Sequence, residues 1–169
     1  MPKNLPMSAN KIAIIGLGNT LRKDDGIGII VLEVLIKSHN QPGMDYLNFG
    51  IAGFDLIHRL EGYAAVLLID GIDAGLKAGE LKISGIEKLD YDLKDTVSST
   101  HEFNLKNLFE LCKKFNLKTK IYLAGIQVKD VSYGEGLSPE LKARLDQILQ
   151  EISCFINKIF PRPCFNLID

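Results

Sequence analysis

The 169-residue sequence predicts an α/β protein, specifically a three-layer α/β/α sandwich with helices on both faces of a mainly parallel sheet. Short apolar runs alternate along the chain with segments of helical periodicity. The runs are continuously apolar, which is typical of strands buried on both faces rather than of strands with one wet face. Such strands, separated by helices, indicate parallel pairing with helical crossovers.

The apolar runs predict strands over residues 11–16, 45–50, 64–70, 79–85 and 120–127, of which GELKISG (79–85) has the weakest pattern. Helical periodicity covers residues 26–39 and 52–62. A further helix is expected after Ser99 and Glu102, which have the S-x-x-E spacing of a capping box.

The last helix is expected to begin at Ser138-Pro139, an N-cap followed by proline at the first helical position. Its apolar stripe continues to Ile159, and the prolines at 161–163 end it. A chain of this length is most simply one domain. We expect residues 1–10 to be a flexible leader, 11–160 to form the domain and 161–169 to be a mobile tail.

Composition excludes several classes of protein. The chain is 46% apolar and 24% charged, which is typical of a globular protein and not of a disordered one. Its net charge of −1, from 20 basic and 21 acidic residues, argues against a nucleic-acid partner, which would require a basic face. We expect no membrane span, since no apolar run approaches the roughly 20 residues that one needs.

The three cysteines form no C-x-x-C pair, and the first ten residues lack the apolar core of a secretory signal. We therefore expect a reduced, cytoplasmic protein. Cys112 and Cys154 fall on apolar stripes of predicted helices, so both are expected to be core thiols, with Cys164 in the tail. Neither is expected to be a catalytic nucleophile.

Residues that follow the predicted strands are the candidates for chemistry, because ligands of open α/β sheets bind outside the carboxyl ends of the strands. The first strand is followed by an acidic pair, Asp24-Asp25, and the central strand by Asp70 and Asp73. The remaining candidates are His101, in the loop TVSSTHEFN, and Gln127 and Lys129, after the last strand.

The stretch GLGNTL after the first strand raises the alternative of a nucleotide-binding or nucleotide-hydrolysing domain. A dinucleotide fingerprint requires a third glycine where Leu21 stands, and an acidic residue after the second strand, where FGIAG has none. Carboxylates at the head of the next helix also occupy the end of the dipole where a phosphate would sit. The pattern therefore fits a nucleotide poorly.

Of the three histidines, His101 is the candidate for a functional role. No G-x-S-x-G elbow is present, and we expect His39 and His58 to be surface or packing residues. His101 falls in the first turn of the predicted capped helix, where the helix dipole disfavours protonation and leaves the neutral imidazole that binds metals. The alternative is a histidine that only caps its own helix.

Asp25, Asp70 and His101 together would present two carboxylates and one imidazole. This donor set, with open positions, suits a first-row divalent ion such as nickel or zinc. Because the three residues come from distant segments, spacing alone does not prove the set.

The succession IIGLGNTLRKDDGIG, GIAGFDL, LLIDGID, THEFNL and YLAGIQ resembles the hydrogenase maturation proteases, the endopeptidases that trim the C-terminus of the [NiFe]-hydrogenase large subunit. The resemblance extends from about Lys11 to about Ile159. It implies a phosphorylase/hydrolase-like sandwich on a mixed five-stranded sheet, with one antiparallel strand, which we expect at 79–85 or its neighbour.

The resemblance also assigns roles. Asp25, Asp70 and His101 match the three metal ligands of the family and are the expected catalytic residues. Family members often have proline before the histidine, where this chain has Thr100. The tight turns of the family match Gly16, Gly18 and Gly53, and the nearby acids Asp24 and Asp73 would tune the site or face solvent.

In this family the substrate brings the metal. The resemblance therefore implies nickel held in the large-subunit precursor as the recognised group, although another divalent ion would fit the same residues in the free protein. It implies the precursor as partner. We expect a monomer, since nothing in the sequence suggests an obligate dimer. A non-catalytic hydrogenase assembly factor is the remaining alternative.

Overall fold

The computed structural model describes residues 11–39, 41–51, 55–87 and 105–160. Its strands are β1 (Ile12–Leu17), β2 (Met44–Gly50), β3 (Ala65–Ile72), β4 (Leu81–Gly85) and β5 (Lys120–Gln127). Its helices are the 3₁₀ turn η1 (Lys23–Gly26), α1 (Ile27–His39), α2 (Asp55–Leu60), α4 (Leu105–Lys114) and α5 (Pro139–Ile159).

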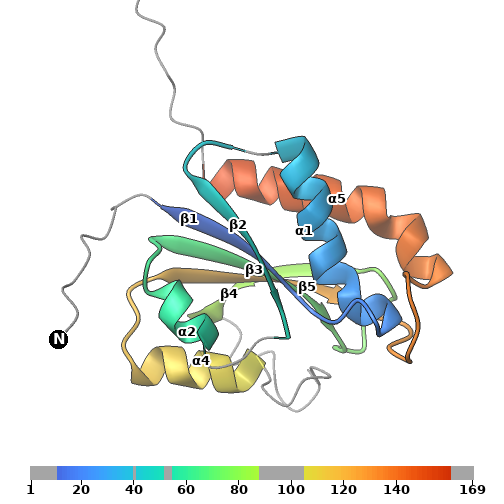
Figure 1. The fold of residues 1–169 in the computed structure, drawn as a ribbon, viewed down its shortest axis with the longest axis horizontal. Coiled ribbons are helices and arrows are strands. Elements are labelled where there is room, and N and C mark those ends of the chain that lie inside the picture. The colour runs from blue at the N-terminus through green and yellow to red at the C-terminus, as the bar shows by residue number, and fades with distance from the viewer. Residues whose placement is uncertain (1–10, 40, 52–54, 88–104, 161–169) are drawn as a thin grey trace, which may run out of the picture.

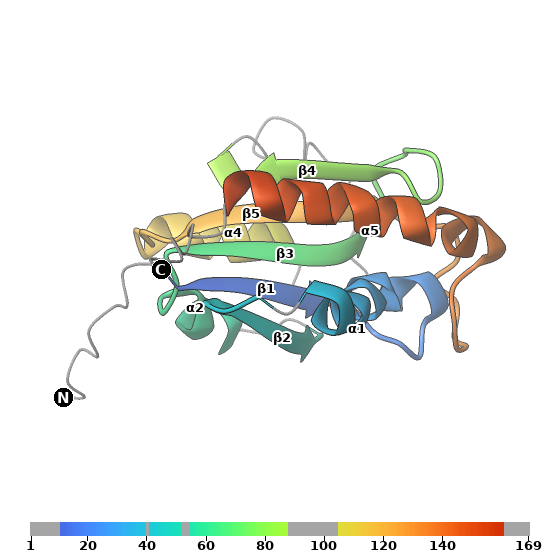
Figure 2. The same ribbon diagram turned by 90° about the horizontal axis from the view of Figure 1, so that it is seen from above.

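The strands form one five-stranded sheet in the order β2-β1-β3-β5-β4, seen edge-on in Figure 2. Strands β2, β1, β3 and β5 pair in parallel, whereas β4 runs antiparallel to β5. The mixed sheet and its antiparallel strand at 79–85 are therefore confirmed. All four parallel strands deliver their carboxyl ends to the same edge.

Helices cover both faces of this sheet. Helices α1 and α5 lie on one face and α2 and α4 on the other (Figures 1 and 2). Within β1, Ala13 and Ile15 belong to the apolar cluster beneath α2 and α4, while Ile14 belongs to the cluster beneath α1 and α5. The continuous apolar runs of the sequence thus arise because alternate residues enter two separate cores, as the predicted three-layer sandwich requires.

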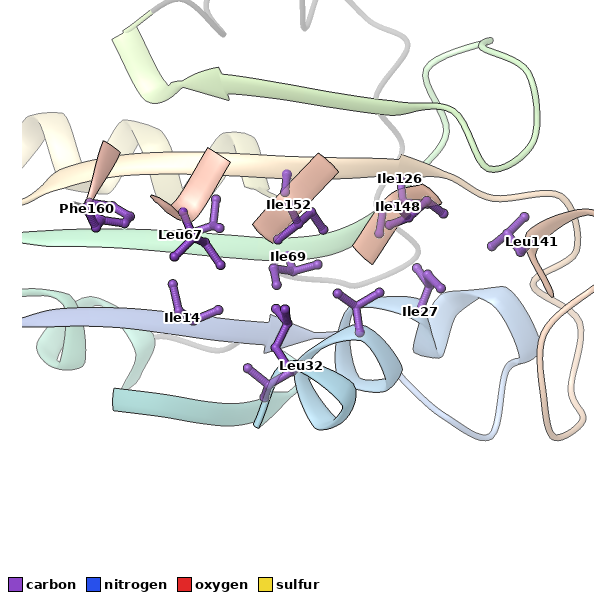
Figure 3. Close-up of a cluster of buried hydrophobic side chains, with 14 of the residues drawn as sticks. Ile14, Ile27, Leu32, Leu67, Ile69, Ile126, Leu141, Ile148, Ile152 and Phe160 are labelled. Carbon is purple, nitrogen blue, oxygen red and sulfur yellow. The ribbon is translucent and has the colours of Figure 1, made fainter. Parts of the chain in front are cut away.

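The larger core lies under α1 and α5 (Figure 3). Its fully buried members include Leu32 of α1, Leu67 and Ile69 of β3, and Ile152 of α5. Figure 3 shows these side chains meeting between the sheet and the two helices. This packing fixes α1, and with it the turn that precedes it, against the central strands.

Helix α5 begins where the sequence predicts. Pro139 is its first residue, and the Ser138 side chain accepts a hydrogen bond from the Leu141 backbone N–H at 3.5 Å. The predicted apolar stripe is the buried face of the helix, and the ring of Phe155 packs edge-on against Tyr122 of β5 with centroids 5.4 Å apart.

The remaining element boundaries differ from the predictions by a few residues. The predicted helix 26–39 is α1, which begins at Ile27 after the turn η1, and α2 ends at Leu60, two residues before the predicted end. The predicted start of that helix, at residues 52–54, lies outside the described residues. Helix α4 is confirmed from Leu105, whereas its predicted cap at Ser99 and Glu102 lies outside the described residues. The predicted leader 1–10 and tail 161–169 lie outside them as well.

One cysteine prediction is wrong. Cys112 is a buried residue of α4, and burial raises the pKa of its thiol to about 11. Cys154 is exposed, because it lies on the outer side of α5 rather than on the buried stripe. Within the described ranges, no helix has both the length and the apolarity that crossing a membrane requires.

Candidate active site at the β1–β3 switch point

The candidate site lies where β3 extends beyond β1. The last paired residues of these strands are Gly16 and Ile69, so Asp70 is the next residue along β3. From β1 the chain crosses to β2 on one side, while β3 and β5 continue the sheet on the other. This reversal of strand order creates a crevice at the carboxyl edge, the usual ligand site of open α/β sheets.

Glycines let η1 and the start of α1 enter this crevice. A Cβ atom on Gly28 would lie 2.2 Å from the Ile69 carbonyl oxygen and 2.4 Å from that of Leu17. One on Gly71 would lie 3.3 Å from the Asp24 carbonyl oxygen. The backbone that carries Asp25 therefore passes directly against the end of β3.

Gly18 makes the turn that returns the chain toward the site. Its φ is +127°, and a Cβ there would lie 1.9 Å from the Asp25 carbonyl oxygen. The same oxygen accepts a hydrogen bond from the Asn19 backbone N–H at 3.2 Å. The predicted role of Gly18 as a tight turn is confirmed, whereas Gly53 lies outside the described residues.

Asp25 and Asp70 are both buried, each with 2% of its surface exposed. Burial, reinforced by the negative charge of Asp25, raises the pKa of Asp70 to about 8, and a hydrogen bond with the Gly71 backbone acts weakly in the opposite direction. The Asp24 carbonyl oxygen lies against Gly71, the residue after Asp70, so the turn that carries Asp25 packs on the end of β3. Both acids are thus buried at the same edge of the sheet.

A divalent cation fits this pair. The Asp70 Oδ1 atom is buried and has no hydrogen-bond partner within the described part of the chain. A buried carboxylate oxygen without a partner is costly, and a cation would satisfy it while also removing the repulsion between the two acids.

His101, the expected third ligand, lies outside the described residues, so its position relative to the two aspartates is still a prediction. Among the residues that the structure does describe, no group of three or more His, Cys, Asp or Glu side chains is placed to hold a metal ion. The described His58 is exposed on α2, as predicted for a surface residue.

The alternative of a phosphate-binding loop is disfavoured by the hydrogen bonds of residues 18–25. A phosphate loop offers free backbone N–H groups to its ligand. Here the N–H groups donate instead to oxygen atoms of the protein, as those of Gly18, Asn19, Leu21, Arg22, Lys23, Asp24 and Asp25 all do. These seven N–H groups are therefore already bonded within the protein and are not free to bind a phosphate.

Asp24 neither faces solvent nor joins Asp25 in the crevice. It is fully buried, and its carboxyl oxygens accept three backbone hydrogen bonds from the segment after β5. Of the two predicted alternatives for Asp24, facing solvent is wrong, whereas tuning the site stays a prediction. No local pattern in the sequence marks this contact, because the donors lie more than 100 positions away along the chain.

Gln127 and Asp73 form a second polar contact at the same edge of the sheet. The buried Gln127 side chain accepts hydrogen bonds from the N–H groups of Ala74 (2.8 Å) and Leu76 (3.1 Å) and donates one to Asp73 Oδ1 (3.1 Å). These bonds hold the loop after β3. Asp73 supports that loop and is exposed, so the predicted alternative that it faces solvent is confirmed.

Comparisons with known proteins agree on one family. The family model described as hydrogenase maturation protease matches residues 29–154, a range that includes Asp70 and His101 and begins four residues after Asp25. The hydrogenase expression/formation protein HoxM of Azotobacter vinelandii is 25% identical over 147 residues, covering 85% of this chain and 71% of its own. A putative hydrogenase maturation protease of Methanocaldococcus jannaschii is 26% identical over 157 residues, covering 90% of this chain and 100% of its own.

Solved structures give the same answer. The [NiFe] hydrogenase maturation protease HycI from Thermococcus kodakarensis superposes with a TM-score of 0.68 at 26% identity, over 88% of this chain and 93% of its own. The maturating endopeptidase HybD from E. coli shares the fold, with a TM-score of 0.74 at 20% identity over the same shares. Since the family model covers most of the chain, the protein belongs to the hydrogenase maturation protease family.

Proposed function

We propose that this protein is the endopeptidase that removes the C-terminal extension of a nickel-loaded [NiFe]-hydrogenase large-subunit precursor. Family membership supports the protease activity and the class of substrate. The observation that carries the proposal is the buried pair Asp25–Asp70 at the switch point of the sheet, with one oxygen of Asp70 left without a described partner. A pair of this kind is suited to a cation that arrives with the substrate.

In this proposal Asp25, Asp70 and His101 contact the nickel of the precursor, or a water bound to it, from the protease side. Nickel is part of the substrate, so a nickel-free precursor lacks the group that is recognised. Bound there, the metal would polarise the scissile carbonyl or supply hydroxide, and a carboxylate would assist proton transfer.

We further propose that the protein acts in the cytoplasm as a monomer, with the precursor as its partner. Free thiols at Cys112 and Cys154 fit a reducing compartment. The nearly balanced charge of the chain fits a protein partner better than a nucleic acid.

Single substitutions in the donor set test this function. We expect Asp25→Asn, Asp70→Asn and His101→Ala each to keep the fold and to abolish processing of nickel-loaded precursor, followed by mass spectrometry of the precursor. Matched controls are Asp146→Asn and His58→Ala, which change the same residue types at exposed positions and should cut normally. Normal cutting by all three site variants would show that the site is wrongly assigned.

A further inference from the structure

The first acid of the pair, Asp24, has a complete set of hydrogen bonds. Its Oδ2 atom accepts from the backbone N–H groups of Lys129 and Asp130, both at 2.9 Å, and its Oδ1 atom accepts from that of Ser138 at 2.6 Å. The residue is 0% exposed. Bonds from N–H donors to a carboxylate are stronger than those between neutral groups, so this side chain is firmly held.

These bonds are part of a larger clamp between the turn around η1 and the segment 128–138. The Asp24 N–H donates to the Asp130 carbonyl at 3.1 Å, and the Lys23 N–H donates to the Gly134 carbonyl at 2.9 Å. The Lys23 ammonium also forms an ion pair with Asp130 at 2.5 Å. Figure 2 shows the two segments side by side at the end of the sheet, beyond the carboxyl ends of β1 and β5.

The geometry of η1 separates the two neighbouring acids. In a 3₁₀ helix, with about three residues per turn, consecutive side chains point roughly 120° apart. Asp24 faces the segment 128–138, so the Asp25 side chain points to a different side of the turn. The turn that carries Asp25 is thus tied to the segment 128–138 through the side chain of the preceding residue.

We propose that Asp24 is a positioning residue, which clamps η1 to the segment 128–138 and thereby holds the Asp25 carboxyl group against Asp70 in the productive geometry. The inference rests on the proposed function for its effect on cleavage, but not for its effect on structure. Asp24 touches no reacting group and acts only through Asp25. A misplacement of about 1 Å in an active site can cost about 100-fold in rate, which is why such a clamp matters.

Asp24→Asn tests the clamp, because the amide has the same shape but replaces one accepting oxygen with a donor. The matched control is Ser138→Ala. It removes the hydroxyl that caps α5 but leaves the Ser138 backbone N–H that donates to Asp24. Both variants loosen the same region, and only the first disturbs the carboxyl group.

We expect Asp24→Asn to speed amide hydrogen exchange at Lys129 and Asp130 and to displace Asp25 from Asp70 in its crystal structure. With nickel-loaded precursor, kcat/KM should fall about tenfold or more, whereas Ser138→Ala should stay within about twofold of the wild type. If Asp24→Asn does not fold, Asp24→Glu, which carries the same carboxylate on a longer arm, is judged by the same criteria.

The outcomes separate the two proposals. Wild-type protein that leaves nickel-loaded precursor uncut overturns the proposed function, and the clamp is then decided by the position of Asp25 in the variant crystal structure. Wild-type protein that cuts, together with an Asp24→Asn variant as active as Ser138→Ala, overturns the clamp and leaves the function standing. An Asp25 side chain that stays in place in the Asp24→Asn structure overturns the clamp in either case.

Discussion

Asp24 and Asp25 are adjacent in the chain and both are buried, yet their carboxyl groups have opposite surroundings. Asp24 accepts three backbone N–H bonds, which compensate its charge. The charge of Asp25 acts on another buried acid, Asp70, and helps to raise its pKa. A buried acid whose pKa is strongly shifted is typical of functional sites.

The raised pKa of Asp70 predicts how stability depends on pH in the metal-free protein. The folded-state pKa is about 8, above the ordinary value of 3.8, so the folded protein binds a proton that the unfolded chain has already released. The contribution of this carboxyl group to the free energy of unfolding is complete below about pH 4 and is lost as the pH rises to 8. Each pKa unit corresponds to about 1.4 kcal/mol, which makes the loss several kcal/mol.

Asp70→Asn should remove this dependence. We expect the variant to gain free energy of unfolding relative to the wild type as the pH rises from 5 to 9, measured by urea denaturation in the presence of a chelator. Asp146→Asn, at an exposed position, controls for the change of charge. A difference between Asp70→Asn and wild type that is constant across this range would contradict the raised pKa.

At the scale of elements, the site depends on how closely the start of α1 approaches β1 and β3. Gly28 makes that approach possible, since any larger side chain would meet two carbonyl oxygens of the sheet. Backbone atoms in a central sheet cannot move aside as a flexible side chain can. Gly28 of α1 is therefore required by packing against the sheet rather than by a ligand.

We predict that Gly28→Ala destabilises the protein by about 3 kcal/mol or more, even though alanine favours a helix over glycine by about 1 kcal/mol. The control is Gly62→Ala, where a Cβ would meet only the Arg59 carbonyl oxygen at an ordinary 3.6 Å. That variant should stay within about 0.5 kcal/mol of the wild type in chemical denaturation. Equal stability of the two variants would show that α1 does not need the close contact.

Helix α5 offers a second test of element packing. Ile152 is fully buried in the core of Figure 3, so Ile152→Ala should cost about 2–5 kcal/mol by leaving a cavity. Gln150→Ala, at an exposed position of the same helix, should change little. Thermal unfolding would show the difference as a shift of roughly 2–4 °C for each kcal/mol; a buried-site variant that melts with the control would refute the packing.

Most of the described helices and strands could be predicted from the sequence, because the patterns that indicate them are local. Continuous apolar runs identify strands such as 120–127, and Ser138-Pro139 identifies the first turn of α5. The antiparallel pairing of β4 was expected only from the family resemblance, since pairing direction depends on distant segments. The anchoring of Asp24 by residues more than 100 positions away left no local signal.

The exposure of the Cys154 side chain on α5 shows a second limit of prediction from sequence. Cys154 and Phe155 are both apolar and adjacent, but they lie on opposite sides of the border of the buried stripe. Phe155 packs on Tyr122, and Cys154 points outward. Periodicity gave the buried stripe correctly, and the error came from including a residue beside it.

At the scale of the whole molecule, an apolar core packs on each face of the sheet, and loops lie at its carboxyl edge. The loop after β1, the end of β3 and the segment after β5 come together there, and each contributes an acid or its support. The amino ends of the four parallel strands lie at the opposite edge (Figure 2). The architecture thus concentrates the buried acids of the described chain at one place.

The most direct measurement is to incubate this protein with nickel-loaded and with nickel-free large-subunit precursor and to follow the mass of the precursor. The account predicts a C-terminal mass loss in the nickel-loaded sample only, and no loss there when Asp25→Asn replaces the wild type. Equal cutting of both precursors would contradict recognition through nickel. An uncut nickel-loaded precursor would contradict the proposed protease function itself.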